Sequence, residues 1–432
     1  MKQDVNTFMR NRDCVLNHLP MAKEKVRIME KYGITPAGPH WPEVKRMLEE
    51  LHAGSISAEE ALEMLASRSG ISRRETENDL LACYKTGLLE CHITDKCDLN
   101  CIECHYRNKK GETIPYDALA DYFKALAPKA ITITGGGEPN CYFSQGKTLH
   151  DVVKLARQIN PAVGLGLINN NTRIPEGDWV DDLDWQRTSV DAVDAAQYAR
   201  IKGADRYEAC VANIGTLLNS SDIPFVGLGF LYRKENIDSM PDFLQLWFGR
   251  FQAMTKSAQA KFNIQFRPIA PGIDEVADYD GAEWGRERRA AAATGAVISM
   301  AADDPAFERF LREKTNFYSI NADGYSYFLH TPKPFTHCYN ALLHRVLRAD
   351  GDEYPDFLLC NLPGMALGNV MKSASPDLER VKIALGTFYF YHRLAAGRCN
   401  PNICRQGWVS NAIETNWDAD TESMGVPRRY FF

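Results

Sequence analysis

The stretch Cys97-Asp-Leu-Asn-Cys101-Ile-Glu-Cys104 carries three cysteines, separated by three residues and then by two. Three thiols cannot all pair with one another as disulfides, because one is always left over. They can instead ligate three corners of an iron–sulfur cluster, since cysteine thiolate is the usual ligand of such clusters. A 4Fe–4S cluster has four irons, so this loop would leave the fourth iron open to a small molecule.

Two plainer interpretations of the three cysteines stay open, a zinc knuckle and a chance run of cysteines. A structural zinc site requires a fourth protein ligand, usually in paired Cys-x2-Cys spacing. His105 adjoins Cys104 but is a poor substitute for that ligand. The spacing therefore favours the iron–sulfur cluster over zinc.

Composition sets the broad class of the protein. With 432 residues, 45% of them hydrophobic and 25% charged, the chain has room for two or three globular domains. The formal net charge of −6 points to neither nucleic acid nor an anionic membrane as a partner. We find no run of about 18 apolar residues and no secretion signal, so we expect a cytoplasmic protein. In that compartment, grouped cysteines more often mean metal or catalysis than disulfides.

From Gly87 to about Pro268 the chain alternates short apolar segments with helical ones, which is typical of repeated β-α units and a parallel sheet. Six strands with intervening helices predict an α/β fold, a partial (β/α)6 TIM-like barrel with its chemistry at the C-terminal ends of the strands. The predicted strands are 88–94, 130–134, 163–168, 186–190, 224–232 and 262–267.

We expect four regions: an N-terminal helical domain (1–87), the barrel (88–274), a helical bridge (275–324) and a small C-terminal α+β domain (325–432). In the first region, Ser57 with Glu60 and Ser72 with Glu75 have capping-box spacing and predict two helix starts. This region also faintly resembles the helical half of a precursor-peptide recognition domain. The strands of such a domain are missing, which favours a plain helical cap.

A second motif follows the predicted strand 130–134, where Gly135-Gly-Gly-Glu138 ends in Pro139. Glycines at a strand end let the backbone approach a ligand closely, although a glycine-rich turn in this position is common. Together with the three cysteines some 30 residues earlier, the motif resembles the radical S-adenosylmethionine (radical SAM) family. The resemblance implies that the open iron chelates SAM and that Gly136, Gly137 and Glu138 hold the amino group of its methionine.

Two further strand ends resemble this family. Arg187-Thr-Ser189-Val-Asp191 looks like its Arg-x-Ser-x-Asp motif, which implies that Ser189 contacts the SAM ribose and Arg187 its carboxylate. Asn170 stands where relatives often have Thr-Asn-Gly. One departure concerns the adenine: the residue before the third cysteine is often aromatic in the family, but here it is Glu103. Tyr106 is the candidate to replace it.

A second group of cysteines lies near the C-terminus. Asp350-Gly351, which lies between Cys338 and Cys360, predicts a hairpin. The group resembles the twitch, or shortened SPASM, extension of radical SAM enzymes. That resemblance implies one auxiliary 4Fe–4S cluster with four protein ligands. A structural zinc site with the same four ligands is the alternative. The four candidate ligands are Cys338, Cys360, Cys399 and Cys404.

Two residues beside these motifs are candidates for catalysis. Cys141 follows the glycine motif on a loop at the expected active face, where a thiol can give a hydrogen atom to a substrate radical, as in some family epimerases. His105 can line the same pocket. The plainer interpretation of Cys141 is a buried small hydrophobe, as for most of the remaining cysteines.

The resemblance implies an enzyme that cleaves SAM reductively to a 5′-deoxyadenosyl radical and removes a hydrogen atom from its substrate. We expect a small polar, sugar-like substrate and dehydrogenation, deoxygenation or epimerisation chemistry. A maturase of ribosomally made precursor peptides is the first alternative. A non-catalytic iron–sulfur electron-transfer protein or a zinc-binding protein is the second. An electron donor such as flavodoxin or ferredoxin is the expected protein partner.

Overall fold

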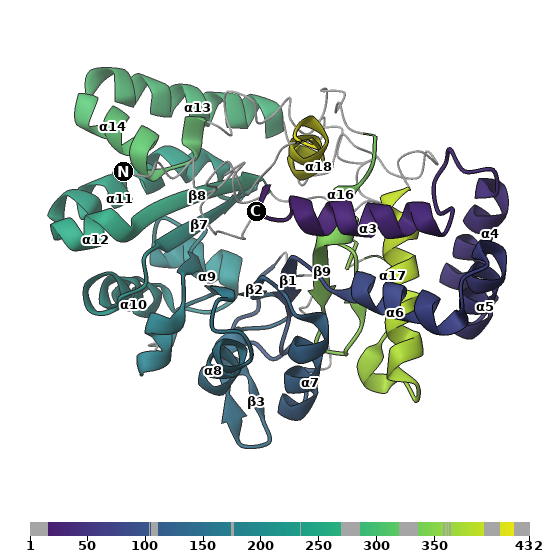
Figure 1. The fold of residues 1–432 in the computed structure, drawn as a ribbon. Coiled ribbons are helices and arrows are strands. Elements are labelled where there is room, and N and C mark those ends of the chain that lie inside the picture. The colour runs from purple at the N-terminus through teal and green to yellow at the C-terminus, as the bar shows by residue number, and fades with distance from the viewer. Residues whose placement is uncertain are drawn as a thin grey trace.

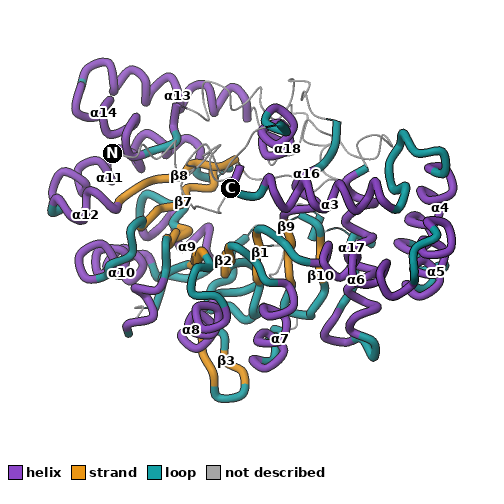
Figure 2. The backbone as a smooth tube through the Cα atoms, in the orientation of Figure 1, coloured by secondary structure: helices purple, strands orange, loops and turns teal. Residues whose placement is uncertain are grey.

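The computed structural model describes residues 16–102, 104, 111–173, 177–233, 235–268, 286–318, 336–356, 359–360, 362, 364–392 and 407–418. Its centre is an eight-stranded sheet in the order β10-β9-β1-β2-β5-β6-β7-β8 (Figures 1 and 2). All pairings are parallel except that of β10 with β9. The strands are β1 Leu88–Cys91, β2 Ala130–Ile133, β5 Gly164–Asn169, β6 Trp185–Ser189, β7 Val226–Tyr232, β8 Phe262–Pro268, β9 His344–Leu347 and β10 Glu353–Tyr354.

The six predicted strands and the predicted fold class are confirmed. Strands β1, β2, β5, β6, β7 and β8 follow one another in both sequence and space, as repeated β-α units require. The sheet is open in the part of the chain described, and β9 lies parallel to the outer edge of β1. The hairpin predicted around Asp350-Gly351 is also present, as β9 and β10.

Helices connect these strands and cover the sheet. A two-stranded hairpin, β3 Phe143–Ser144 with β4 Lys147–Thr148, and three short 3-10 turns, η1 Pro139–Cys141, η2 Asp178–Asp182 and η3 Ile237–Ser239, complete the connections. The predicted helical bridge is helical over α13 Arg286–Asp303 and α14 Pro305–Lys314, and its residues 275–285 and 319–324 lie outside the described residues. The connecting helices are α7 Tyr116–Leu126, α8 Leu149–Ile159, α9 Ala195–Lys202, α10 Tyr207–Ser220, α11 Met240–Ala253 and α12 Lys256–Lys261.

The two faces of the sheet differ in chemistry. Side chains alternate along a strand, and one alternate set joins the main hydrophobic core with the helices, for example Leu89, Ile131 and Leu228. The other set is largely polar, and we call it the polar face. Its polar members are Glu90 and His92 from β1 and its end, Thr132 from β2, Arg187 from β6, Asn263, Gln265 and Arg267 from β8, and His344 from β9. The same set also contains apolar side chains such as Leu88, Ile168 and Val346.

Two glycines of β7 allow side chains of the neighbouring strands to meet across the polar face. Gly227 and Gly229 stand between β6 and β8 in register. Because they carry no side chain, Arg187 reaches over β7 and donates from Nη1 to Oε1 of Gln265 at 2.7 Å. A Cβ atom on Gly227 would lie 2.7 Å from Oδ1 of Asn263. These two glycines therefore make room for neighbouring polar side chains.

The helices at the two ends of the chain share a second hydrophobic core. Figure 1 shows the purple and blue N-terminal helices beside the yellow-green α17. Ser57 and Ser72 cap α5 and α6 as predicted, and Ser57 forms a full capping box with Glu60. The division into four domains stays a prediction. The helices are α3 Leu19–Lys31, α4 Trp41–His52, α5 Ala58–Ser69, α6 Arg73–Tyr84, α16 Tyr339–Leu343, α17 Pro376–Tyr391 and α18 Gly407–Thr415, with the 3-10 turn η5 Val370–Lys372 before α17.

Lys25 fastens this second core to the sheet. Its side chain is buried, and its Nζ donates to the carbonyl oxygens of Lys85 and Leu342, each at 2.6 Å. These carbonyls lie just before β1 and just before β9, so one ammonium group joins α3 to both strands. Among the described residues no helix is both long enough and apolar enough to cross a membrane.

Two glycine substitutions test this packing. A Cβ on Gly166 would lie 2.2 Å from the indole ring of Trp185, whereas a Cβ on Gly215 in α10 would meet nothing within 4 Å. We expect Gly166→Ala to lower the free energy of unfolding by about 1–3 kcal/mol through overpacking. The matched Gly215→Ala should raise it by about 0.5–1 kcal/mol, because alanine loses less backbone entropy in a helix. Urea unfolding measures both changes, and a Gly166→Ala protein as stable as the parent would contradict the packing described.

Candidate functional site

The chemical motifs meet at one edge of the sheet. The loop that carries Cys97, Cys101 and Cys104, which we call the cysteine loop, follows β1. The glycine motif, Gly135-Gly-Gly-Glu138, follows β2, Asn170 follows β5, and Ser189 ends β6. These strands run parallel, so their C-terminal ends lie together. The structure therefore gathers those predicted site residues of the barrel that it describes on neighbouring strand ends.

Backbone contacts clamp the glycine motif onto the cysteine loop. The backbone N–H of Gly137 donates to the carbonyl oxygen of Thr94 at 2.7 Å, and that of Glu138 donates to Lys96 at 2.8 Å. A Cβ on Gly137 would lie 2.0 Å from the Lys96 oxygen, and one on Gly136 would lie 2.7 Å from Oδ1 of Asp95. Gly136 also has a positive φ of 66°. Both positions therefore require glycine for the contact between the loops.

Glu138 is buried beneath this contact. Its Oε1 accepts from the backbone N–H of Asn140 at 3.1 Å and from Nδ2 of Asn140 at 2.7 Å, while its Oε2 accepts from the backbone N–H of Asn170 at 2.7 Å. Burial raises the pKa of this carboxyl to about 7, although the hydrogen bonds oppose that rise. Asn170 in turn donates from Nδ2 to Oδ1 of Asp98 at 2.7 Å. One chain of contacts thus joins the ends of β2 and β5 to the middle of the cysteine loop.

The thiols of the cysteine loop suit an iron–sulfur cluster by their chemistry. None of them forms a disulfide; Cys97 is exposed, and Cys101 and Cys104 are half-buried. The backbone N–H of Leu99 donates to Sγ of Cys97 at 3.4 Å, and hydrogen bonds to cluster-ligating sulfurs help to set the potential of such clusters. In the described part of the chain, no three Cys, His, Asp or Glu side chains are gathered in a metal-binding arrangement. The fit of this loop to an iron–sulfur cluster therefore rests on its three thiol groups and on their position at the strand ends. His105, Tyr106 and Glu103 lie outside the described residues.

Arg187 lies on the polar face, and Ser189 lies half-buried at the end of the same strand. Burial lowers the pKa of the Arg187 guanidinium to about 10, while the charges of Glu90 and Asp191 oppose this. Gln265 accepts from Nη1 of Arg187 and also from Nη2 of Arg267, the latter at 2.9 Å. The structure thus gives Arg187 a protein partner, and its predicted contact with the SAM carboxylate stays a prediction.

Cys141 lies in η1, close to the cysteine loop. Burial raises the pKa of its thiol to about 11, and the nearby Asp98 carboxylate adds to this effect. The group therefore stays a protonated thiol at neutral pH, and a protonated thiol is the form that has a hydrogen atom to give. Its catalytic role stays a prediction.

Sequence reasoning missed a carboxylate–imidazole group on the polar face. Nε2 of His92 lies 2.9 Å from Oε1 of Glu90. His344 on the neighbouring β9 is buried, and among the described residues neither of its ring nitrogens has a hydrogen-bond partner. The alternation Leu-Leu-Glu-Cys-His could have placed Glu90 and His92 on one face. Only the pairing of β9 with β1 brings in His344.

The C-terminal cysteines are described only in part. Cys338 is half-buried at the N-cap of α16, and its backbone N–H donates to the carbonyl oxygen of Tyr391 at 3.1 Å. Cys360 is buried in a small cluster with Val346 and Tyr354. Cys399 and Cys404 lie outside the described residues. The auxiliary cluster therefore stays a prediction.

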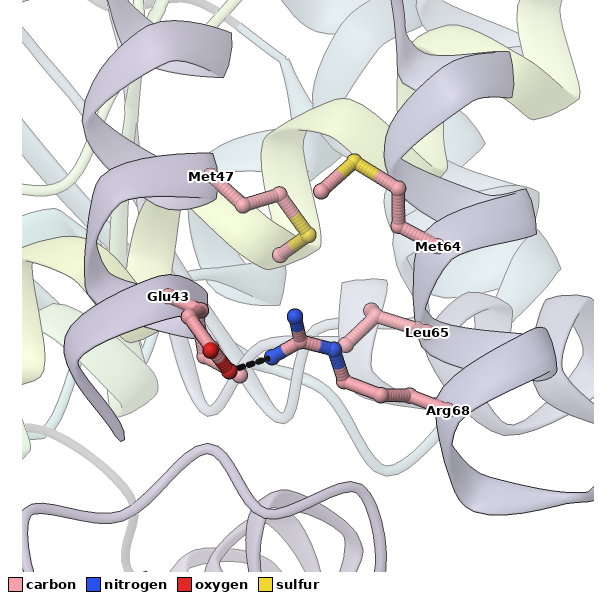
Figure 3. Close-up of a pocket in the computed structure, with 6 residues that line it drawn as sticks. Glu43, Met47, Met64, Leu65 and Arg68 are labelled. Carbon is pink, nitrogen blue, oxygen red and sulfur yellow. Dashed lines mark ion pairs between the residues drawn. The ribbon is translucent and has the colours of Figure 1, made fainter. Parts of the chain in front are cut away.

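A shallow hollow lies elsewhere, between α4 and α5. Figure 3 shows the ion pair between Arg68 and Glu43, with nitrogen and oxygen 2.9 Å apart, beside Met47 and Met64. The lining holds no nucleophile and no group of metal ligands. We therefore assign the chemistry to the strand ends and not to this hollow.

Comparison with known proteins finds likeness in structure only. No protein-family model and no curated sequence matches the chain. SuiB of Streptococcus suis bound to S-adenosylmethionine matches with a TM-score of 0.47 and 12% identity, over 90% of this chain and 92% of that one. SuiB bound to the precursor peptide SuiA matches with a TM-score of 0.48 and 13% identity, over 78% and 77%. BtrN in complex with AdoMet and 2-DOIA matches with a TM-score of 0.33 and 12% identity, over 74% and 92%.

At TM-scores below 0.5, these matches carry no conclusion about the family, the activity or the substrate of this chain.

The burial of His344 gives a pH-dependent stability. Burial lowers the pKa of its imidazole to about 4, whereas an unfolded histidine has a pKa of about 6.5. As pH falls from 6.5 to 4, the unfolded ring takes up a proton that the native ring does not, so the native protein loses stability. The loss should approach about 1.4 kcal/mol per pH unit. In urea unfolding at pH 7, 6 and 5, His344→Gln should lose this part of the pH slope.

His40 supplies the control for that experiment, because its side chain is 59% exposed. His40→Gln should leave the pH slope of unfolding as it is in the parent protein. If His344→Gln and the parent lose stability equally between pH 7 and pH 5, the native His344 ring is not held neutral.

Proposed function

We propose that the chain is a radical SAM enzyme whose Cys97, Cys101 and Cys104 hold a 4Fe–4S cluster with one iron open to SAM. The observation that carries this proposal is the clamp between the cysteine loop and the glycine motif, with backbone hydrogen bonds of 2.7 and 2.8 Å. It joins the two motifs that cluster and SAM binding require. A mere electron-transfer or zinc protein has no need of a second motif fastened in this way.

The residues around the clamp would each contact a different part of SAM. Gly136, Gly137 and Glu138 would hold the SAM amino group, because a carboxylate and backbone carbonyls suit an ammonium. Asn170 fixes the Glu138 carboxylate from the next strand. Ser189 at the end of β6 would contact the ribose, Arg187 the carboxylate and Tyr106 the adenine. When bound, the cluster supplies the electron that cleaves SAM to a 5′-deoxyadenosyl radical.

The substrate that we propose is small and polar, with several hydroxyl or amino groups. The polar face supports this choice, because it places charged and amide side chains where the other face places aliphatic ones. The N-terminal helices support it too: among residues 16–87 the structure has only helices and no strand, so the strands of a peptide-recognition domain are absent there. A precursor-peptide maturase remains the second candidate, and SuiB was solved with such a peptide.

The C-terminal cysteines would hold the auxiliary 4Fe–4S cluster, Cys338 and Cys360 together with Cys399 and Cys404. The proposed reaction removes a hydrogen atom from a substrate C–H bond, and the auxiliary cluster, when bound, would supply an acceptor for one further electron. An external donor such as flavodoxin or ferredoxin would reduce the first cluster.

Anaerobic reconstitution tests the proposal directly. The parent protein should hold about eight irons per chain, from two 4Fe–4S clusters. Cys97→Ala/Cys101→Ala/Cys104→Ala and Cys338→Ala/Cys360→Ala should each hold about four. With dithionite and SAM, the parent and the second variant should form 5′-deoxyadenosine, and the first variant should not. Bound zinc in place of iron, or no cleavage of SAM by the iron-loaded parent, would reject the radical SAM assignment.

The transfer of deuterium from a labelled substrate to 5′-deoxyadenosine tests the proposed substrate class. Deuterated polyhydroxylated or amino-substituted small molecules should place deuterium in 5′-deoxyadenosine, whereas deuterated precursor-type peptides should not. Arg267→Met should weaken that transfer, because it removes a cation from the polar face, but should leave SAM cleavage without substrate unchanged. Transfer from peptides alone would favour the maturase.

A further inference from the structure

The middle of the cysteine loop is held by α9. The backbone N–H of Asn100 donates to the carbonyl oxygen of Lys202 at 2.9 Å, and that of Ile102 donates to Ile201 at 3.0 Å. These two amides flank Cys101 in the sequence. The position of Cys101 therefore depends on where the last turn of α9 lies.

The end of α9 is shaped for this contact. The last carbonyl groups of a helix have no partner within it, so those of Ile201 and Lys202 are open to the loop. Gly203 ends the helix with a φ of +71°. A Cβ at this position would lie 2.5 Å from the carbonyl oxygen of Asn100. Only a residue without a side chain lets the helix end approach the loop so closely.

A buried ion pair fixes the same turn. Nζ of Lys202 bonds to Oδ2 of Asp191, and each side chain is only 4% exposed. Asp191 is itself fixed, because its Oδ1 accepts from the backbone N–H of Leu231 at 2.5 Å and its carbonyl oxygen accepts from Nδ2 of Asn236 at 2.8 Å. It also has a positive φ of 58°. A continuous set of contacts thus runs from the end of β7 through Asp191 and Lys202 to Cys101.

We propose that Asp191 and Lys202 are positioning residues that hold Cys101 in place for the iron–sulfur cluster through the last turn of α9. We call this set of contacts the latch. The step from the latch to the cluster rests on the proposed function. The latch does not supply a ligand, and neither charged group needs to touch SAM or substrate.

The alternative is that the pair only stabilises the fold. Ion pairs that are buried often contribute little net stability, although removal of one partner leaves a costly unpaired charge. α9 has eight residues, and its N-terminal end is already capped by Asp194. The pair instead acts on the end that meets the loop. Its effect should therefore be local to the loop and separable from global stability.

Hydrogen exchange of the metal-free protein tests the latch without any cluster. We would compare the parent with Lys202→Met and with Asp191→Asn, which keeps the shape of the side chain and removes its charge. Exchange of the peptide spanning 97–104 should become at least about tenfold faster in both variants, because the amides of Asn100 and Ile102 lose their fixed acceptors. Lys25→Met is the matched control, since it removes another buried lysine that bonds to carbonyl groups far from the loop. It should leave exchange of 97–104 unchanged.

Iron retention tests the consequence for the cluster. In the Cys338→Ala/Cys360→Ala background, iron loss to a chelator should be at least about tenfold faster with Lys202→Met or Asp191→Asn than with Lys25→Met. The comparison is made at equal distance below each melting temperature, so a general loss of stability does not count. Equal exchange and equal iron loss in latch and control variants would overturn the inference. A parent protein that takes up no iron would instead reject the proposed function, while the exchange result would still decide the latch.

Discussion

The contact between the cysteine loop and the glycine motif is the constraint on which the site depends. Two backbone hydrogen bonds form only because Gly136 and Gly137 have no Cβ atom, and the space that a side chain would need is filled by the loop itself. The packing of the two loops therefore requires glycine at both positions, whether or not a ligand is bound. It also places Glu138 in the interior, where the amide groups of Asn140 and Asn170 take the place of water.

The cysteine loop is held from both sides by backbone atoms. The glycine motif holds its beginning and the last turn of α9 holds its middle, while the side chain of Asp98 bonds to Asn170 between them. The hydrogen bonds from the glycine motif and to α9 use main-chain groups of the loop and not its thiol groups. The position of Cys101 therefore depends on Ile201 and Lys202, which lie far from it in the sequence.

The polar face is a second consequence of small residues. Gly227 and Gly229 in β7 let Arg187 and Gln265 meet across a strand, and β9 adds His344 from the side of β1 that faces away from β2. Burying such groups is unfavourable unless they find partners. Among the described residues, His344 has a buried ring with no hydrogen-bond partner at either nitrogen. A face with this composition is suited to a ligand that brings hydrogen-bonding groups of its own.

The sequence by itself determined the order of strands, the capped helices and the motifs, because alternation, caps and cysteine spacing are local properties of the chain. Ser57 with Glu60 and the Asp350-Gly351 hairpin were predictable for the same reason. Local patterns could not give the Asp191–Lys202 pair, the meeting of Arg187 with Gln265, or the place of His344 beside β1. These contacts join distant segments through register and helix packing. Only the tertiary structure therefore decided which polar groups meet at the site.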